Sequence, residues 1–403
     1  MKRLLLLTLV ACGGAKPTPP AAPPSEPAAP AAPTTGDPTA AMPPPPSAPP
    51  KAVGKAKDDL IPRAVLFGNP ERANVQISPD GKQLSWLAAK DGVLNIWVAP
   101  VGKLDQAKAV TNDAARPIRQ YFWAFTNKHI IYLQDSAGDE NWHVFRVDLA
   151  NSKVTDLTPF EKARAAVDEI SEKQPTTIAV SINDRDAKVF DAYKIDLMSG
   201  KRTLVAQNDD GFTGFQYDPD LKLRFANKRM PDGSNQIMMA ELKGDKVTWK
   251  PWDTIPFEDA ESTGLAGVVP GGKAVYFTES RNRDTAAVVQ VDIASKKQTV
   301  IAEDKRVDSS DIIMHPSKHT LQAVGFAYDK LAWKVIDKSI EKDLANLAKL
   351  DGGEVHISSR TIDDKWWVVA TTSEQHPGHY YLWDRAKQKG TFLFAGRPEV
   401  EKV

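Results

Sequence analysis

Short apolar runs recur along the chain from about residue 60 onwards, and a tight polar turn that ends in lysine precedes each of them. The clearest copy is the turn 79–82 (PDGK) before the apolar run 83–87, and the next is the turn 126–128 before 129–133. Self-similarity at a fixed period is the signature of repeat architectures. Seven of these lysines follow one another at intervals of 45 to 51 residues: Lys82, Lys128, Lys173, Lys222, Lys273, Lys318 and Lys365.

A second unit lies in the back half of most repeats and has the pattern of a strand, a short turn and another strand. Examples run from Val147 to Thr158 and from Ile195 to Ala206. Two hairpins per repeat make a four-stranded sheet, so the pattern predicts an all-β fold, a seven-bladed β-propeller. The blades are expected to start near Ala73, Ile118, Val167, Phe212, Ser262, Val307 and Val355.

The sixth repeat contains a different pattern. Ile340, Leu344, Leu347 and Leu350 follow one another at offsets of 4, 7 and 10, which places them on one face of a helix. We therefore expect a single helical insertion in this repeat and almost no helix elsewhere in the propeller.

The first residues have the pattern of an export signal. A short basic start precedes the apolar run Leu4–Val10, which is far shorter than the ~20 residues that a membrane-spanning helix needs. The run leads into Cys12, the single cysteine of the chain, in a segment that resembles a bacterial lipobox. The resemblance implies a signal peptide over residues 1–11 and a lipid on Cys12. Gly13 follows instead of Asp, which favours anchoring in the outer membrane, facing the periplasm or the cell surface.

Residues 12–57 are predicted to be a disordered linker behind this lipid anchor. Half of the 30 prolines of the chain lie between Pro17 and Pro50, and no aromatic residue precedes Phe67. Such a segment cannot bury enough apolar surface to offset its ordering entropy. We interpret it as a spacer that holds a domain, residues 58–403, away from a membrane.

Composition and motifs exclude several kinds of function. The chain has 52 basic and 52 acidic residues, and this zero net charge argues against a nucleic-acid partner. A single cysteine excludes an intramolecular disulfide and a cysteine-rich zinc site. No glycine-rich phosphate loop is present, and no glycine has a serine two positions later, so the serine elbow of α/β-hydrolases is absent too. No cofactor is predicted.

Two histidine pairs have spacings that could suit metal ligands. His315 and His319 are predicted to lie on a turn between blades, and His376 and His379 flank Pro377 and Gly378 in a predicted hairpin. Neither pair has a cysteine or a plausible third ligand close to it in the sequence, so no metal site is predicted.

A set of motifs follows in order from residue 60 to the end: 61–70, 77–82, 92–98, 138–143 (GDENWH), 183–193 and 377–384 (PGHYYLWD). Together they resemble the N-terminal propeller of bacterial serine peptidases of the prolyl oligopeptidase family, in particular the acylaminoacyl-peptidase and dipeptidyl-peptidase branch. The turn 78–82 (SPDGK) alone is a weak sign, because TolB-like propellers share it.

In that family an α/β-hydrolase domain with the catalytic Ser, Asp and His follows the propeller. Seven residues follow Gly396 here, so no catalytic residue can be assigned. The resemblance implies that the propeller covers an active site, limits access by size and in some members holds the N-terminus of the peptide. Glu140, with its neighbours Asp139 and Asn141, could face such a chamber. The alternative is that Glu140 forms a salt bridge within its hairpin.

Three functions stay open on the sequence. The first is a non-catalytic, substrate-gating propeller whose hydrolase partner is missing or separately encoded. The second is a free-standing TolB-like lipoprotein scaffold that binds a protein or peptide. The third is the truncated reading frame of an intact peptidase. The first and third predict hydrolase coding sequence directly downstream, and the second predicts none.

Overall fold

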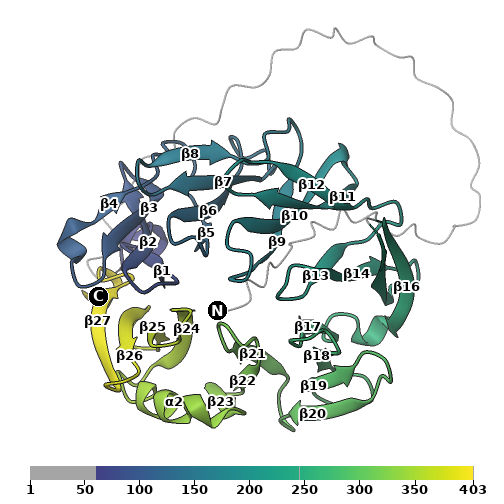
Figure 1. Ribbon diagram of the computed structural model, residues 1–403. Coiled ribbons are helices and arrows are strands. Elements are labelled where there is room, and N and C mark those ends of the chain that lie inside the picture. Colours follow the sequence, from purple (N-terminus) through teal and green to yellow (C-terminus); the bar gives the residue numbers. More distant parts are fainter. Residues whose placement is uncertain (1–59, 245, 403) are drawn as a thin grey trace, which may run out of the picture. The chain divides into compact units, whose positions relative to one another are not determined.

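The computed structural model describes residues 60–244 and 246–402. Within these residues, 27 strands form seven antiparallel sheets that are arranged as the blades of a ring (Figure 1). The chain divides into two compact units, and the unit that contains Arg63–Val403 holds every one of these strands. The predicted all-β, seven-bladed propeller is therefore confirmed.

Each blade is built from strands that are consecutive in the chain, and each strand pairs with its neighbours in sequence. Before blade 1 lies the short helix α1 (Arg63–Phe67). Blade 1 contains β1 (Ala73–Ile77), β2 (Gln83–Lys90), β3 (Val93–Pro100) and β4 (Lys108–Ala109), with the 3-10 turn η1 (Leu104–Gln106). Blade 2 contains β5 (Gln120–Trp123), β6 (His129–Gln134), β7 (His143–Asp148) and β8 (Lys153–Asp156); blade 3 contains β9 (Ala165–Ile170), β10 (Thr177–Asp186), β11 (Val189–Asp196) and β12 (Arg202–Ala206).

Blades 4 and 5 repeat the same order of four strands. The 3-10 turn η2 (Phe257–Asp259) lies in the connection between them. Blade 4 contains β13 (Gly214–Tyr217), β14 (Leu223–Arg229), β15 (Asn235–Lys243) and β16 (Lys246–Ile255); blade 5 contains β17 (Gly264–Val268), β18 (Ala274–Glu279), β19 (Ala287–Asp292) and β20 (Gln298–Ala302).

Blade 6 differs from the others because its sheet has three strands in the described residues. The helix predicted in this repeat is present, but it follows the third strand, at the point of the chain where the other blades have a fourth strand. Ile340, Leu344 and Leu347 are buried against blades 6 and 7. Blade 6 contains β21 (Ser309–Met314), β22 (Leu321–Ala327), β23 (Leu331–Val335), η3 (Lys338–Ile340) and α2 (Glu341–Leu347); blade 7 contains β24 (Glu354–Arg360), β25 (Trp366–Thr372), β26 (His379–Asp384) and β27 (Lys389–Ala395), before η4 (Val400–Lys402).

The hydrophobic core lies between the blades. Strand β6 is buried along its whole length, because alternate side chains of a strand point to opposite faces of its sheet. Ile130 and Tyr132 pack in the cluster between blades 1 and 2, whereas Ile131 and Leu133 pack in the cluster between blades 2 and 3. One such cluster fills each of the seven interfaces. This explains why the repeats show continuous apolar runs as well as alternating ones.

The recurring lysine marks the turn between the first and second strands of a blade. In five blades the residue before this lysine has a positive φ, a conformation that Gly, Asn and Asp adopt most readily. Leu221 also has a positive φ although leucine rarely adopts one, and its side chain is fully buried. The residues with positive φ before the lysine are Gly81 (76°), Asn127 (58°), Leu221 (53°), Gly272 (65°) and Asp364 (59°).

The ring closes between blades 7 and 1 without a shared strand, since each of these sheets uses only its own consecutive strands. The seam is instead a hydrophobic cluster that includes Val75 and Trp86 from blade 1 and Phe394 from blade 7. Hydrogen bonds cross it as well: the amide of Ile77 donates to the hydroxyl of Ser359 (2.7 Å).

Candidate functional site

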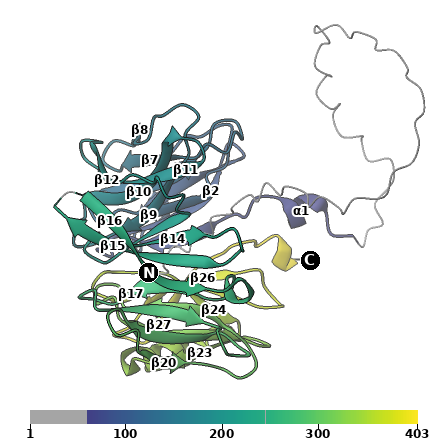
Figure 2. The same ribbon diagram turned by 90° about the vertical axis from the view of Figure 1, so that its right-hand side faces the viewer.

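Antiparallel pairing divides the strand ends between two faces of the ring. The loop face carries the loops between the second and third strands of each blade, the connections between blades, and both ends of the propeller. The turn face carries the turns that join the first strand to the second and the third to the fourth. In agreement, Figure 2 shows α1 and the C-terminal end of the chain on the same side of the ring.

The predicted site residues Asp139, Glu140 and Asn141 lie together on the loop face, in the loop between β6 and β7. This loop spans residues 135–142, whereas the corresponding loop of blade 1 consists of two residues, 91 and 92. Ala137 and Glu140 both have a positive φ, of 54° and 59°. Non-glycine residues rarely adopt this conformation, and where they do, the surrounding structure must hold them in it.

A buried ion pair forms the base of this hairpin. The carboxylate of Asp135 is fully buried and accepts two hydrogen bonds from Arg116, at 3.1 and 2.9 Å. It also accepts a bond from the backbone amide of Glu140 (3.3 Å). Sequence reasoning missed Asp135, although a signal existed: an acidic residue two positions after the apolar run 130–133 is expected to be buried and to require a partner. The pair therefore fixes the backbone position of Glu140.

Asp139 stabilises the tip of the hairpin. Its carboxylate accepts bonds from the side chain of Asn141 (3.1 Å) and from the backbone amides of Asn141 (3.1 Å) and Ser136 (3.2 Å). The bond from the Asn141 side chain is the largest cause that lowers the pKa of Asp139 below its ordinary value. Asp139 is thus ionised at neutral pH and serves to shape the loop.

Glu140 is exposed, and its carboxylate forms no hydrogen bond or ion pair with any described residue. Glu140 therefore does not make the salt bridge that the sequence left open; the acidic residue of this loop that forms an ion pair is Asp135, with Arg116 from the connection before β5. The hairpin thus presents a free carboxylate on a fixed backbone, next to the negative charge of Asp139. Such a pair of carboxylates can bind a cation, for example the ammonium group of a peptide N-terminus.

The second histidine pair also lies on the loop face. His376 is in the loop between β25 and β26, and His379 is the first residue of β26. The fold brings Asp351 to them, from the connection that leads into β24. Among the described residues, these three form a group whose potential ligand atoms lie within 4.8 Å of one another. The fold therefore places a third potential ligand next to the pair, which was not visible near it in the sequence.

The first histidine pair lies on the turn face, within blade 6. His315 and His319 belong to the turn between β21 and β22, so the predicted position between blades is wrong. His319 reaches across the ring axis, and its Nε2 lies 2.8 Å from a carboxylate oxygen of Glu172 in the corresponding turn of blade 3. Blades 3 and 6 are on opposite sides of a seven-membered ring, so this contact bridges the turn face.

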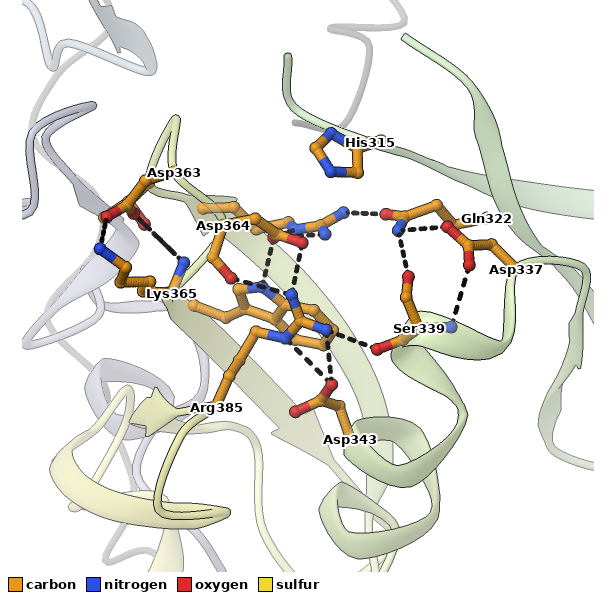
Figure 3. Close-up of polar contacts among 12 residues, drawn as sticks. His315, Gln322, Asp337, Ser339, Asp343, Asp363, Asp364, Lys365 and Arg385 are labelled. Carbon is orange, nitrogen blue, oxygen red and sulfur yellow. Dashed lines mark hydrogen bonds and ion pairs between the residues drawn. The ribbon is translucent and has the colours of Figure 1, made fainter. Parts of the chain in front are cut away.

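A polar network on the same face links blades 6 and 7 (Figure 3). Asp364 accepts hydrogen bonds from Arg360 (2.6 Å), Arg385 (2.5 Å) and the indole of Trp367 (2.8 Å). Arg385 also pairs with Asp343 on α2 (2.9 Å). Because these charges are mutually paired, the network holds helix α2 and the turn around Asp364 and leaves no free charge for a ligand.

A cavity of about 290 Å³ lies between the outer parts of blades 4 and 5, lined by residues that include Trp252, Arg281 and Lys296. Arg281 pairs with both Glu279 (2.6 Å) and Asp253 (3.0 Å), so its charge is already neutralised. This cavity therefore offers less to a charged ligand than the hairpin at Glu140.

Cys12, the predicted lipidation site, lies outside the described residues. In the part of the chain that the structure describes, no helix is long and apolar enough to cross a membrane.

Comparison with known proteins identifies relatives of this propeller. No family model matches the chain. The chain is 46% identical over 346 residues to dipeptidyl aminopeptidase BIII of Pseudoxanthomonas mexicana, a match that covers 86% of this chain and 50% of the relative. It is 26% identical over 364 residues to dipeptidyl peptidase family member 6 of Caenorhabditis elegans, a match that covers 85% of this chain and 48% of the relative. The chain thus spans about half the length of the curated relatives it matches.

Solved structures share the fold at low sequence identity. Prolyl oligopeptidase B from Galerina marginata superposes with a TM-score of 0.59 at 10% identity, over 81% of this chain and 51% of that protein. A puromycin-hydrolysing peptidase of Mycobacterium tuberculosis gives a TM-score of 0.55 at 11% identity, over 81% and 54%. These likenesses show the fold alone. Together with the sequence matches, they show a seven-bladed propeller that resembles the propeller domains of the prolyl oligopeptidase and dipeptidyl peptidase families.

Proposed function

We propose that this chain provides the substrate-gating and peptide-binding propeller of a serine peptidase of the prolyl oligopeptidase family, and that a lipid on Cys12 anchors it to a membrane. The observation that carries the proposal is the position of Glu140. Its unpaired carboxylate lies on a fixed hairpin, at the face from which both ends of the propeller emerge. A catalytic domain joined to these ends would cover the loop face and enclose Glu140.

In this proposal Glu140 binds the N-terminal ammonium group of a peptide. A carboxylate at a fixed distance from the catalytic serine determines how many residues fit between the N-terminus and the bond that is cleaved. The names of both curated relatives describe dipeptidyl peptidases. We therefore infer release of N-terminal dipeptides as the activity of the whole peptidase, with Glu140 as the group that sets this length.

Helix α1 supports a covering domain on this face. None of its side chains is buried, and Leu66 and Phe67 are 43% and 77% exposed. Large apolar side chains that are exposed next to each other are typical of contact surfaces. We propose that these two residues pack against the hydrolase domain in the complete peptidase.

Catalysis belongs, in this proposal, to the hydrolase domain and not to the propeller. Acyl transfer needs an activated nucleophile, a base within hydrogen-bond reach and an oxyanion hole, and the sequence lacks the elbow that would expose a serine. We expect the chain alone to hydrolyse no peptide, ester or acylated amino acid. A fluorophosphonate probe, which labels activated serines, should leave it unlabelled; stoichiometric labelling at one serine would overturn the non-catalytic role.

The binding role of Glu140 can be tested on the chain itself. The affinity of an unblocked tripeptide and of its N-acetylated form is measured by calorimetry. A charge-assisted hydrogen bond contributes about 1.5–3 kcal/mol, so Glu140→Gln should weaken binding of the unblocked peptide by roughly tenfold or more. Glu261→Gln, a 92% exposed carboxylate in the connection between blades 4 and 5, is the control that should change nothing.

The outcome separates the gating role from the scaffold. Equal affinity for blocked and unblocked peptides, unaffected by Glu140→Gln, would favour a free-standing scaffold. The downstream ~300 codons provide an independent check, since a hydrolase domain needs roughly 200 residues or more. A Gly-x-Ser-x-Gly motif in that stretch supports the gating propeller or a truncated peptidase frame, and its absence supports the scaffold.

The anchor has its own test. Attachment through two or more acyl chains is stable, because each buried CH₂ contributes about 0.8 kcal/mol. Cys12→Ser should therefore release the protein from the membrane fraction into the soluble fraction. A variant that still sediments with membranes would refute the lipid anchor without affecting the proposal for Glu140.

A further inference from the structure

We propose that Asp351, His376 and His379 form a binding site for a divalent transition metal ion, with zinc the best fit to the donors. The three residues come from separate segments of blade 7: the connection before β24, the loop between β25 and β26, and the start of β26. All three lie on the loop face. One carboxylate and two imidazoles are a ligand set that zinc accepts.

The distances agree with this assignment. Oδ2 of Asp351 lies 3.1 Å from Nδ1 of His379 and 3.6 Å from Nε2 of His376. Two ligand atoms that are each about 2.0–2.1 Å from a tetrahedral zinc ion lie about 3.3 Å apart. The observed pairs are close to this value, so the ion can replace the proton that now links His379 to Asp351.

The observation that points to a ligand is the lack of hydrogen-bond partners for the buried ring of His376. Its side chain is only 9% exposed, and neither ring nitrogen has a hydrogen-bond partner among the described residues. A buried polar group without a partner is rare in proteins and calls for an explanation, of which an ion is one. Nε2 of this ring faces the carboxylate of Asp351.

The imidazole rings require one adjustment to bind the ion. The rings of His376 and His379 are stacked, with centroids 4.0 Å apart and an angle of 7° between their planes. A metal ion lies in the plane of each imidazole that binds it, so one of the two rings must turn about its Cβ–Cγ bond. No hydrogen bond to the ring of His376 opposes this turn.

Neighbouring groups already orient the other two ligands. Nε2 of His379, the nitrogen that points away from the ion, lies 3.0 Å from Glu401. This arrangement of carboxylate, histidine and metal is the usual outer shell of zinc sites. Asp351 accepts hydrogen bonds from Thr371 (2.6 Å) and Tyr381 (3.0 Å). Although burial raises the pKa of Asp351, these bonds outweigh it and lower the pKa below the ordinary value, so the carboxylate is ionised as a metal ligand must be.

The site would connect the end of the propeller to blade 7. Glu401 belongs to η4, and through His379 a bound ion would fix the segment that leaves the last strand. This consequence is independent of the role proposed for Glu140, which lies in blade 2.

The test measures metal binding by the full chain. Protein treated with a chelator and dialysed is titrated with zinc against a chromophoric chelator, and the bound metal is counted by mass spectrometry. We expect one equivalent of zinc. His376→Gln and Asp351→Asn should each weaken binding by about 100-fold or more, since loss of an outer-shell partner alone costs 10–100-fold. His143→Gln is the matched control, because His143 pairs with a single carboxylate, Asp156 (2.7 Å), and should bind as the wild type does.

A second measurement needs no variant. Diethyl pyrocarbonate modifies free imidazole nitrogens, so zinc should protect His376 in the wild-type chain, and peptide mass mapping reports this directly. If the wild-type chain takes up no zinc, or if zinc binds but leaves His376 unprotected and both variants bind it as well as the wild type, the three residues are only a hydrogen-bonded cluster and the proposal is wrong.

Discussion

The turns between the first and second strands are nearly uniform in length, whereas the loops between the second and third strands, on the other face of the ring, differ from blade to blade. The turn between the first and second strands has five or six residues in every blade. The loop between the second and third strands varies from two residues in blade 1 to eight in blade 2. The first turn of each blade therefore keeps nearly the same length around the ring, and the loop on the opposite face does not.

The turns also contact one another. On the turn face, the amide of Asp80 donates to Asn127 of the next blade (2.9 Å), and Lys173 pairs with Asp220 of the next (3.0 Å). On the loop face, the carboxylate of Glu140 and the ring nitrogens of His376 accept or donate no hydrogen bond among the described residues. Loops on a rigid scaffold are where binding groups concentrate. We infer that the turn face maintains the ring and that the loop face carries the function.

The largest effect is expected from the buried charges of the turn face. Asp364→Asn removes the carboxylate that pairs with Arg360, whose side chain is fully buried. Leaving a buried charge unpaired typically costs about 3–5 kcal/mol of unfolding free energy. Urea denaturation should show this loss. Asp363→Asn in the same turn is the control, because the partner of Asp363, Lys365, is 71% exposed, and an exposed pair contributes at most ~1 kcal/mol.

A pH-dependent effect on stability is expected from a buried carboxyl group within a blade, between the two faces of the ring. Burial raises the pKa of Asp168 on β9 to about 7, against a bond from Ser181 that lowers it. The folded protein thus retains a proton that the unfolded chain releases near pH 4, so stability falls as pH rises from about 4 to 7, by at most ~1.4 kcal/mol per pH unit. Asp168→Asn should remove this fall. Parallel stability curves for the variant and the wild type between pH 5 and 8 would contradict it.

A smaller effect is expected at the base of the hairpin. Arg116→Leu leaves the buried carboxylate of Asp135 unpaired, which should cost about 1–3 kcal/mol, since Arg116 itself is one-third exposed. The backbone of Glu140 should then lose its fixed position. The unfolding free energy measured by urea denaturation and the affinity for the peptide should both decrease. A loss of stability with unchanged peptide affinity would show that the hairpin is purely structural.

The smallest effect on stability is expected at the hairpin tip. Glu140→Gln removes a charge that has no partner among the described residues, so the unfolding free energy should stay within about 0.5 kcal/mol of the wild type. Its effect should be confined to peptide binding. A marked destabilisation would instead place Glu140 in the structural framework and erase the distinction between the faces.

The sequence predicted the architecture closely because the repeat is local. Six of the strands that open the blades begin within two residues of their expected starts, and β1 begins at Ala73 itself. Turn residues and apolar runs act on their own blade, so their period is visible in the chain. The expected helix is present, but the sequence did not show that the sheet of blade 6 would have only three strands in the described part of the chain.

Contacts between distant segments could not be predicted in this way. Glu172 and His319 are 147 residues apart, and Asp351 reaches His376 from a connection that has no repeat pattern. Such pairs depend on how the closed ring places its blades, which no local pattern encodes. The family resemblance pointed to Glu140 as a candidate, and the structure adds that the nearby Arg116 is paired with Asp135.

The seam between blades 7 and 1 has a consequence for how the chain folds. Ile77 and Ser359, which meet there, are 282 residues apart. Closing a loop of that length costs about 5 kcal/mol of entropy, against about 1.4 kcal/mol for a five-residue turn. We therefore expect the blades to form early from local hairpins and the seam to form last. Until the seventh blade is synthesised, Val75 and Trp86 of the first blade lack their apolar partners, and this is when the chain is most prone to aggregate.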